Sequence, residues 1–135
     1  MRLWDVTQEG EGRVFRHPPG WWVSSVAFCP DGRRAIAGYY DYSIRLWDLE
    51  TRQEVRYYLG HRGTVTSLAV YGDGRTFLSG SEDHTMRLWD LESGVQRCVF
   101  RGHKDGVKGV TFFAEGGRAV SWSLDGTIRM WQPKE

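Results

Sequence analysis

Tryptophan recurs at a nearly constant interval, and this recurrence constrains the fold more than any other feature of the 135-residue sequence. The string RLWD or a close variant appears four times. Its tryptophans, separated by 43, 42 and 42 residues, are Trp4, Trp47, Trp89 and Trp131. A fixed period of this length indicates one supersecondary unit repeated along the chain.

Each period contains short apolar runs separated by turn residues. One complete copy reads TVTSLAV at 64–70, TFLSGSE at 76–82, TMRLWD at 85–90 and VQRCVF at 95–100. Alternation of apolar and polar residues over such short runs, with Gly and Asp between them, is typical of strands joined by hairpins. No window holds a helical apolar pattern of helical length. We therefore expect an all-β fold with four antiparallel strands, a to d, in each repeat.

The composition excludes several classes of partner. Lys and Arg number 18 and Asp and Glu number 17, so the net charge is +1. This balance predicts neither nucleic acid nor an anionic membrane as a partner. No apolar run approaches the roughly 18 residues of a membrane helix, and no signal-peptide pattern opens the chain. Cys29 and Cys98 lie in unrelated contexts and are expected to be reduced packing residues. These features together predict a cytoplasmic location.

A second motif keeps step with the tryptophans. Gly60–His61 and Gly102–His103 each stand before a copy of the repeat, and both histidines lie 28 residues before the next repeated Trp. Three of the four tryptophans are followed by Asp. With GH and WD pairs in phase, the chain resembles the WD40 family of β-propellers over essentially its whole length. The resemblance implies all-β, four-stranded blades of the WD40 type.

The resemblance also implies a buried polar network in each blade, made of a His, a strand-b hydroxyl, a turn Asp and the strand-c Trp. Carried onto this sequence, the two complete networks are His61, Ser79, Asp83, Trp89 and His103, Ser121, Asp125, Trp131. The Asp would accept the imidazole proton, and the hydroxyl would bridge His and the indole N–H. Every buried polar group would then have a partner.

The first blade and the third depart from the family pattern. In the first, Arg16–His17 replaces the GH pair and Ala37 replaces the hydroxyl residue, although Asp41 and Trp47 remain. We expect this blade to be the least tightly held. In the third, Trp122 stands where the other two repeats have glycine, so the local packing there must differ.

The strand count predicts three blades phased for ring closure. Residues 1–135 form one propeller segment. Its parts are spare c and d strands at 1–17, blade 1 at 18–59, blade 2 at 60–100 and blade 3, without its own d strand, at 101–132. Three blades are too few for a ring. Copies could assemble head to tail, giving six blades in a dimer or nine in a trimer. The alternative is a piece of a larger propeller.

The family resemblance implies a non-catalytic scaffold that binds other proteins through its top rim, where the d–a and b–c loops gather. The candidate partner-binding residues on this rim are Trp21, Trp22, Tyr40, Arg62, Glu82, Lys104 and Leu124. Large aromatics beside Arg are typical of binding hot spots. One or both of Trp21 and Trp22 could instead fold down over blade 1 and replace the packing lost at Ala37.

A His–Ser–Asp trio also invites a catalytic interpretation. Here the trio occurs twice at the same repeat position and is capped by an indole, whereas an enzyme needs a single accessible site. No nucleophile-elbow, phosphate-cradling or metal-spaced pattern accompanies it. The sequence therefore predicts no enzyme, no cofactor and no metal site. A structural, self-assembling propeller module without an evolved partner remains the alternative function.

Overall fold

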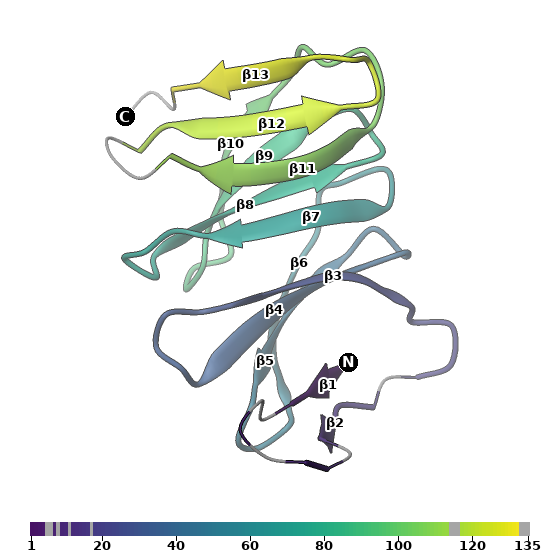
Figure 1. Ribbon diagram of the computed structural model, residues 1–135, viewed down its shortest axis with the longest axis vertical. Helices are drawn as coiled ribbons and strands as arrows, with labels where there is room; N and C mark the ends of the chain where they lie inside the picture. Colours follow the sequence, from purple (N-terminus) through teal and green to yellow (C-terminus); the bar gives the residue numbers. More distant parts are fainter. Residues whose placement is uncertain (5–6, 8, 11, 17, 114–116, 133–135) are drawn as a thin grey trace.

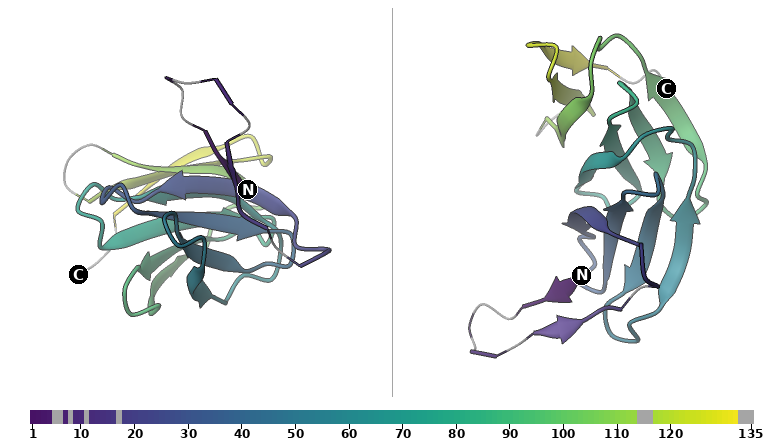
Figure 2. Two further views of the ribbon diagram at one scale, coloured as in Figure 1. Left: turned by 90° about the horizontal axis from the view of Figure 1, so that it is seen from below. Right: turned by 90° about the vertical axis from the view of Figure 1, so that its right-hand side faces the viewer.

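The computed structural model describes residues 1–4, 7, 9–10, 12–16, 18–113 and 117–132. Within these residues the secondary structure consists of strands and turns, without helix, and so holds no helix able to cross a membrane. The sheets follow one another along the long axis of the molecule (Figure 1). Seen from the side they lie along an arc, with the N-terminal strands at one end and the last sheet at the other (Figure 2). The fold is thus all-β, as predicted.

Three sheets carry most of the chain, each with its strands paired antiparallel in chain order. Blade 1 contains β3 (Val23–Phe28), β4 (Arg34–Tyr39), β5 (Ile44–Asp48) and β6 (Glu54–Tyr58). Blade 2 contains β7 (Val65–Val70), β8 (Thr76–Ser81), β9 (Met86–Asp90) and β10 (Gln96–Phe100). Blade 3 contains β11 (Val107–Phe112), β12 (Ala119–Ser123) and β13 (Ile128–Trp131). The four-strand repeat expected from the sequence is therefore present twice in full.

Aspartates at fixed repeat positions shape the turns between these strands. Asp31 accepts hydrogen bonds from the backbone amides of Arg33 and Arg34 at 2.9 and 3.1 Å in the β3–β4 turn. Asp48, the Asp of the WD pair, accepts from the amides of Glu50 and Thr51, both at 2.9 Å. Asp and Asn favour such turns because their side chains bond backbone amides two or three residues ahead. The WD pair therefore combines a buried Trp with a turn-forming carboxylate.

The N-terminal residues form a separate two-stranded sheet. In it β1 (Arg2–Leu3) pairs antiparallel with β2 (Arg13–Val14). Phe15, which follows β2, is 1% exposed and meets the Trp47 ring edge-on at 6.4 Å between centroids. Tyr58 meets Trp89 in the same manner at 6.0 Å. The segment thus packs on blade 1 as strands c and d of a preceding blade would, and completion of blade 3 by β2 stays a prediction.

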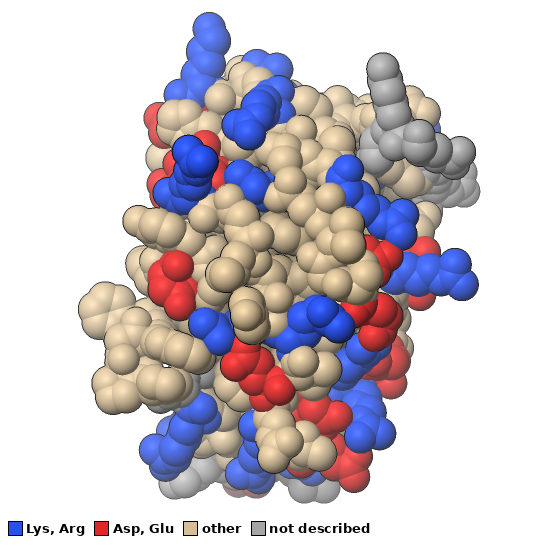
Figure 3. Space-filling view, turned by 180° about the vertical axis from the view of Figure 1, so that it is seen from behind, with Lys and Arg blue, Asp and Glu red and all other residues tan. Residues whose placement is uncertain are grey.

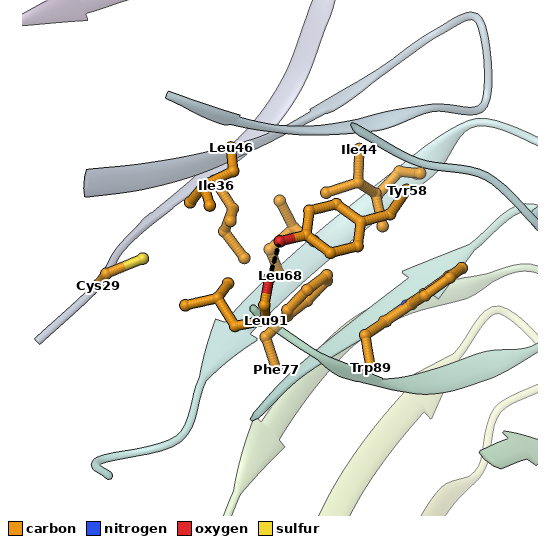
Figure 4. Close-up of a cluster of buried hydrophobic side chains, with 10 residues drawn as sticks. Cys29, Ile36, Ile44, Leu46, Tyr58, Leu68, Phe77, Trp89 and Leu91 are labelled. Carbon is orange, nitrogen blue, oxygen red and sulfur yellow. Dashed lines mark hydrogen bonds between the residues drawn. The ribbon is translucent and has the colours of Figure 1, made fainter. Parts of the chain in front are cut away.

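The apolar core lies mainly between the blades. Figure 4 shows Ile36, Ile44 and Leu46 of blade 1 facing side chains of blade 2. Tyr58 lies among them, and its hydroxyl donates a hydrogen bond to the carbonyl of Leu91. A second cluster joins blades 2 and 3, and a third joins the N-terminal strands to blade 1. Each blade thus depends on its neighbours for the burial of its faces.

Glycine on strand b allows adjacent blades to approach closely. A Cβ added at Gly38 would lie 2.6 Å from Cγ1 of Val65 in blade 2. A Cβ added at Gly80 would lie 2.7 Å from Cγ1 of Val107 in blade 3. A real Cβ cannot come this near. Each glycine therefore leaves the space into which the first valine of the next blade packs, and we call it the seat glycine.

In blade 3 the small residue and the large residue of this cross-strand pair exchange strands. Trp122 replaces the seat glycine, and its cross-strand partner is Gly109, where blades 1 and 2 have Ser25 and Ser67. A Cβ added at Gly109 would lie 1.8 Å from the Trp122 ring. The indole therefore covers its own blade's glycine and occupies the place that a following blade's valine would take.

The two ends of the stack leave apolar side chains uncovered. At the blade 1 end, Val26 is 51% exposed, whereas its counterpart Leu68 is 8% exposed. At the blade 3 end, Ile128 is 77% exposed, whereas its counterpart Met86 is 1% exposed. The same repeat position is thus buried inside the stack and bare at its ends.

Candidate functional site

The predicted network of blade 2 assembles around His61. The imidazole Nδ1 lies 2.8 Å from Asp83 Oδ2, and Nε2 lies 2.6 Å from Ser79 Oγ. The indole Nε1–H of Trp89 donates to the same Ser79 oxygen at 2.8 Å. The four residues come from the loop before β7, from β8, from the β8–β9 turn and from β9. All four predicted side chains therefore meet as one continuous chain of hydrogen bonds.

The bonding pattern assigns a role to each proton. Burial alone would raise the pKa of the Asp83 carboxyl, but hydrogen bonds from His61, Thr85 and the Arg62 amide hold that pKa well below its usual range. An ionised Asp83 accepts a hydrogen bond from His61 Nδ1–H, so the unprotonated Nε2 accepts one from the Ser79 hydroxyl. Burial lowers the pKa of His61. The imidazole is therefore neutral and acts as a structural bridge.

Blade 3 repeats the network with nearly identical distances. His103 Nδ1 lies 2.8 Å from Asp125 Oδ2, and Nε2 lies 2.7 Å from Ser121 Oγ. The Trp131 indole donates to Ser121 at 2.8 Å. Two copies of one arrangement, with both imidazoles almost completely buried, favour a framework role over chemistry at a single site.

Each network has a fifth member that the sequence interpretation missed. The hydroxyl of Thr85 donates to Asp83 Oδ1 at 2.6 Å, and its backbone amide donates to the same oxygen at 2.9 Å. Thr127 makes the corresponding bonds to Asp125. A hydroxyl residue two positions after the turn Asp in each repeat was the available signal. Such a residue completes a local turn in which Asp accepts amides ahead of it.

Blade 1 replaces the missing Ser hydroxyl with a phenol. The Trp47 indole donates to the Tyr39 hydroxyl at 2.9 Å, whereas Asp41 bonds the amide and hydroxyl of Ser43. Tyr39 is fully buried, and burial raises its pKa to about 12. Its phenol reaches the indole from a position two residues after Ala37. The expected weakness of blade 1 stays a prediction, and His17 lies outside the described residues.

The Trp21 ring packs against blade 1, whereas the Trp22 ring projects into solvent. The Arg45 guanidinium stacks 3.7 Å from the Trp21 ring centroid, and Trp21 meets Tyr39 edge-on at 6.3 Å. A stacked guanidinium holds the indole in place by a cation–π contact. This is the packing role that the sequence left open for one of the two tryptophans.

The other predicted rim residues lie at one end of the strands, on the right in Figure 1, where the turn after β12 and the start of β11 are seen. Trp22 is 69% exposed and contacts Tyr40 edge-on at 6.1 Å. Glu82 pairs with Lys108 at 2.8 Å and lines, with Tyr40, a cavity of about 320 Å³. The structure thus brings Trp22, Tyr40 and Glu82 into one neighbourhood.

Three further predicted rim residues lie apart from that neighbourhood. Leu124 is largely exposed on blade 3. Arg62 and Lys104 each donate a backbone amide to a network Asp at 3.0 Å, so their loops are fixed while their side chains remain exposed. The rim therefore has a hydrogen-bonded backbone that carries exposed charged side chains.

The described residues offer little support for a metal site or a reactive cysteine. They hold no group of three or more His, Cys, Asp or Glu placed to bind a metal ion. Both cysteines are free, and burial raises the pKa of the Cys29 thiol to about 11. Such a thiol stays protonated and weakly nucleophilic at neutral pH.

Three stacked antiparallel blades with an internal His–Ser–Asp–Trp network define a segment of a β-propeller. The family described as WD domain, G-beta repeat matches residues 11–48, 52–90 and 94–132. The chain belongs to the WD40 repeat family, whose domains are generally non-catalytic and typically bind proteins.

Two solved structures resemble the chain closely. The "Structure of U3-55K" superposes with a TM-score of 0.83 at 25% identity, covering 89% of this chain and 38% of that one. The "Crystal structure of RRP9 WD40 repeats" gives a TM-score of 0.82, with the same identity and coverage. The chain therefore has the WD40 fold and spans little more than a third of the matched propellers.

Proposed function

We propose that the chain acts as a non-catalytic scaffold that binds partner proteins through the rim carrying Trp22 and Tyr40. The observation that carries the proposal is the exposed aromatic pair on a rigid support. Trp22 and Tyr40 contact each other, and the Tyr40 amide donates to the Trp22 carbonyl at 3.0 Å. Because the backbone is already ordered, little conformational entropy is lost when a partner covers these rings.

The surroundings of the pair suit a protein partner. The cavity beside Tyr40 is bordered by the Glu82–Lys108 ion pair and by Thr64. An apolar centre with a polar edge is the usual composition of a protein interface. On the face seen from behind, acidic and basic side chains are interspersed rather than gathered into a field of one sign (Figure 3). This distribution favours local contacts over long-range attraction of a polyanion.

The test is affinity capture followed by mass spectrometry, with Trp22→Ala/Tyr40→Ala as the variant. Phe113→Ala is the matched control, since Phe113 is also an exposed aromatic but follows β11 at the opposite end of the strands. We expect specific partners to be retained by the control and lost by the double variant. Equal recovery by all three proteins would refute the assignment of this rim.

We also propose that the two bare ends of the stack are covered by further blades, supplied by other copies of the chain. The contrast between exposed Val26 and Ile128 and their buried counterparts supports this. A dimer would hold six blades and a trimer nine. Light scattering on a sizing column distinguishes these from a monodisperse monomer, which would leave the ends uncovered and contradict self-assembly. We propose separately that the chain is located in the cytoplasm, and imaging of a tagged chain tests this.

A further inference from the structure

A pocket in blade 2 is lined by three arginines and lies apart from the Trp22–Tyr40 pair. The cavity measures about 320 Å³, and its walls include Arg62, Arg87, Arg101, Gln96 and Asp83. This volume falls within the range of small-ligand sites. The arginines come from three places, the loop before β7, strand β9 and the segment after β10. Their convergence on one hollow is produced by the fold and not by a run of basic sequence.

The pocket carries an excess of positive charge. Asp83 is the carboxylate among the lining residues, and its oxygens already accept from His61, Thr85 and the Arg62 amide. Among the described residues, the guanidinium groups of Arg62 and Arg101 pair with no carboxylate. Three guanidinium groups thus face one committed carboxylate, leaving a net charge of +2.

Arg87 is held in position before any ligand arrives. Its Nη1 donates to Gln96 Oε1 at 2.6 Å, and its Nε donates to Thr85 Oγ1 at 3.4 Å. Gln96 adds no negative charge, because an amide is neutral, and the one carboxylate near the guanidinium among the lining residues is Asp83, whose Oδ2 lies 3.8 Å from Arg87 Nη2. Burial lowers the pKa of Arg87, and the charges of Arg101 and Arg62 lower it further, against the opposing effect of Asp83. The three cations that line the pocket therefore repel one another.

The corresponding region of blade 1, around Arg45, carries no excess of positive charge. Glu54, which pairs with Trp47 as Gln96 pairs with Trp89, binds Arg45 at 2.8 Å. Trp21 covers that guanidinium, and Leu59 occupies the place of Arg101. The repeat framework is thus satisfied in blade 1 by a neutralised and covered arginine. The open, cationic pocket thus distinguishes blade 2 from blade 1.

We propose that this pocket binds a doubly charged tetrahedral oxyanion, a phosphate monoester on a side chain of a partner protein. The proposal rests on the proposed protein-binding function and names the chemistry that one part of the surface recognises. A guanidinium offers two parallel N–H donors matched to phosphate oxygens. With Arg87 preoriented and two unpaired arginines at the mouth, a dianion would relieve the mutual repulsion that a neutral side chain leaves in place.

The binding test uses the purified chain and three small probes, followed by NMR signals of the arginine Nε–H groups. Inorganic phosphate and O-phosphoserine should produce saturable shifts, whereas serine should produce none. If phosphate binds and O-phosphoserine is excluded, the monoester assignment is overturned. If neither binds, the site itself is overturned. The titration needs no partner, so its failure is separable from failure of the Trp22–Tyr40 capture experiment.

Two variants and one control give the test its specificity. Gln96→Glu installs the carboxylate that blade 1 has, and Arg101→Gln removes one unpaired cation. Each should weaken O-phosphoserine binding about tenfold or more, since one charge-assisted hydrogen bond is worth at least that. Arg75→Gln removes an exposed charge outside the pocket and should leave affinity unchanged. An equal loss in Arg75→Gln would mean non-specific attraction and would overturn the proposal. Unchanged unfolding midpoints verify that all variants remain folded.

Discussion

Ser79 occupies the branch point of the blade 2 network, and its replacement by Ala is the sharpest test of how that network acts. The Ser79 oxygen accepts from the Trp89 indole at 2.8 Å and meets His61 Nε2 at 2.6 Å. All three side chains are almost completely buried. Ser79→Ala therefore removes one atom and leaves two buried polar groups without a partner.

The expected loss follows from those two groups. Each buried donor or acceptor left without a partner costs about 1–3 kcal/mol. Two such groups predict a loss of roughly 2–6 kcal/mol in the free energy of unfolding. Typical domains have total stabilities of about 5–15 kcal/mol. The substitution should therefore remove a large fraction of the stability, although Ala fits the space and introduces no strain.

Guanidinium unfolding followed by tryptophan fluorescence and by circular dichroism measures this loss, at two protein concentrations so that any association is detected. Ser93→Ala is the matched control, because Ser93 is exposed in the β9–β10 turn. It should change the free energy of unfolding by about 0.5 kcal/mol or less. If Ser79→Ala costs less than about 1 kcal/mol, or no more than the control, the reasoning about orphaned partners is wrong.

Two further predictions concern the phenol of blade 1 and the effect of acid. Tyr39→Phe removes the hydroxyl that accepts the hydrogen bond of the Trp47 indole and should cost about 1 kcal/mol by the same unfolding assay, while Tyr71→Phe, on a half-buried ring, should be nearly neutral. Acidification should lower stability in two steps, first below the ordinary His pKa of 6.5 and again below the Asp value of 3.8. The native pKa values of His61 and Asp83 are both lowered, so the unfolded chain takes up protons first. A melting temperature that increases as the pH is lowered from 7.5 to 5 would contradict this.

The sequence was sufficient for features that repeat and insufficient for those that do not. The period of Trp and the spacing of His61 and Asp83 predicted the blades and the members of their networks, because each hydrogen bond lies within one repeat. Tyr39 escaped notice because its phenol reaches the indole from a position where other blades carry a small residue. The arginine pocket also escaped notice, since it depends on three segments that only the folded sheet brings together.

The exchange of Trp122 and Gly109 determines where repeats can be inserted into this chain. The junctions after blades 1 and 2 are equivalent, each with a glycine seat and an incoming valine. A duplicated copy of blade 2, placed between blades 2 and 3, would meet matching surfaces on both sides. The same copy placed beyond blade 3 would meet an indole where its valine needs a hollow. Gain and loss of repeats by recombination, or by design, is therefore permitted in the interior, whereas any blade added at the outer face of blade 3, including one supplied by another copy of the chain, requires the Trp122 indole to move aside.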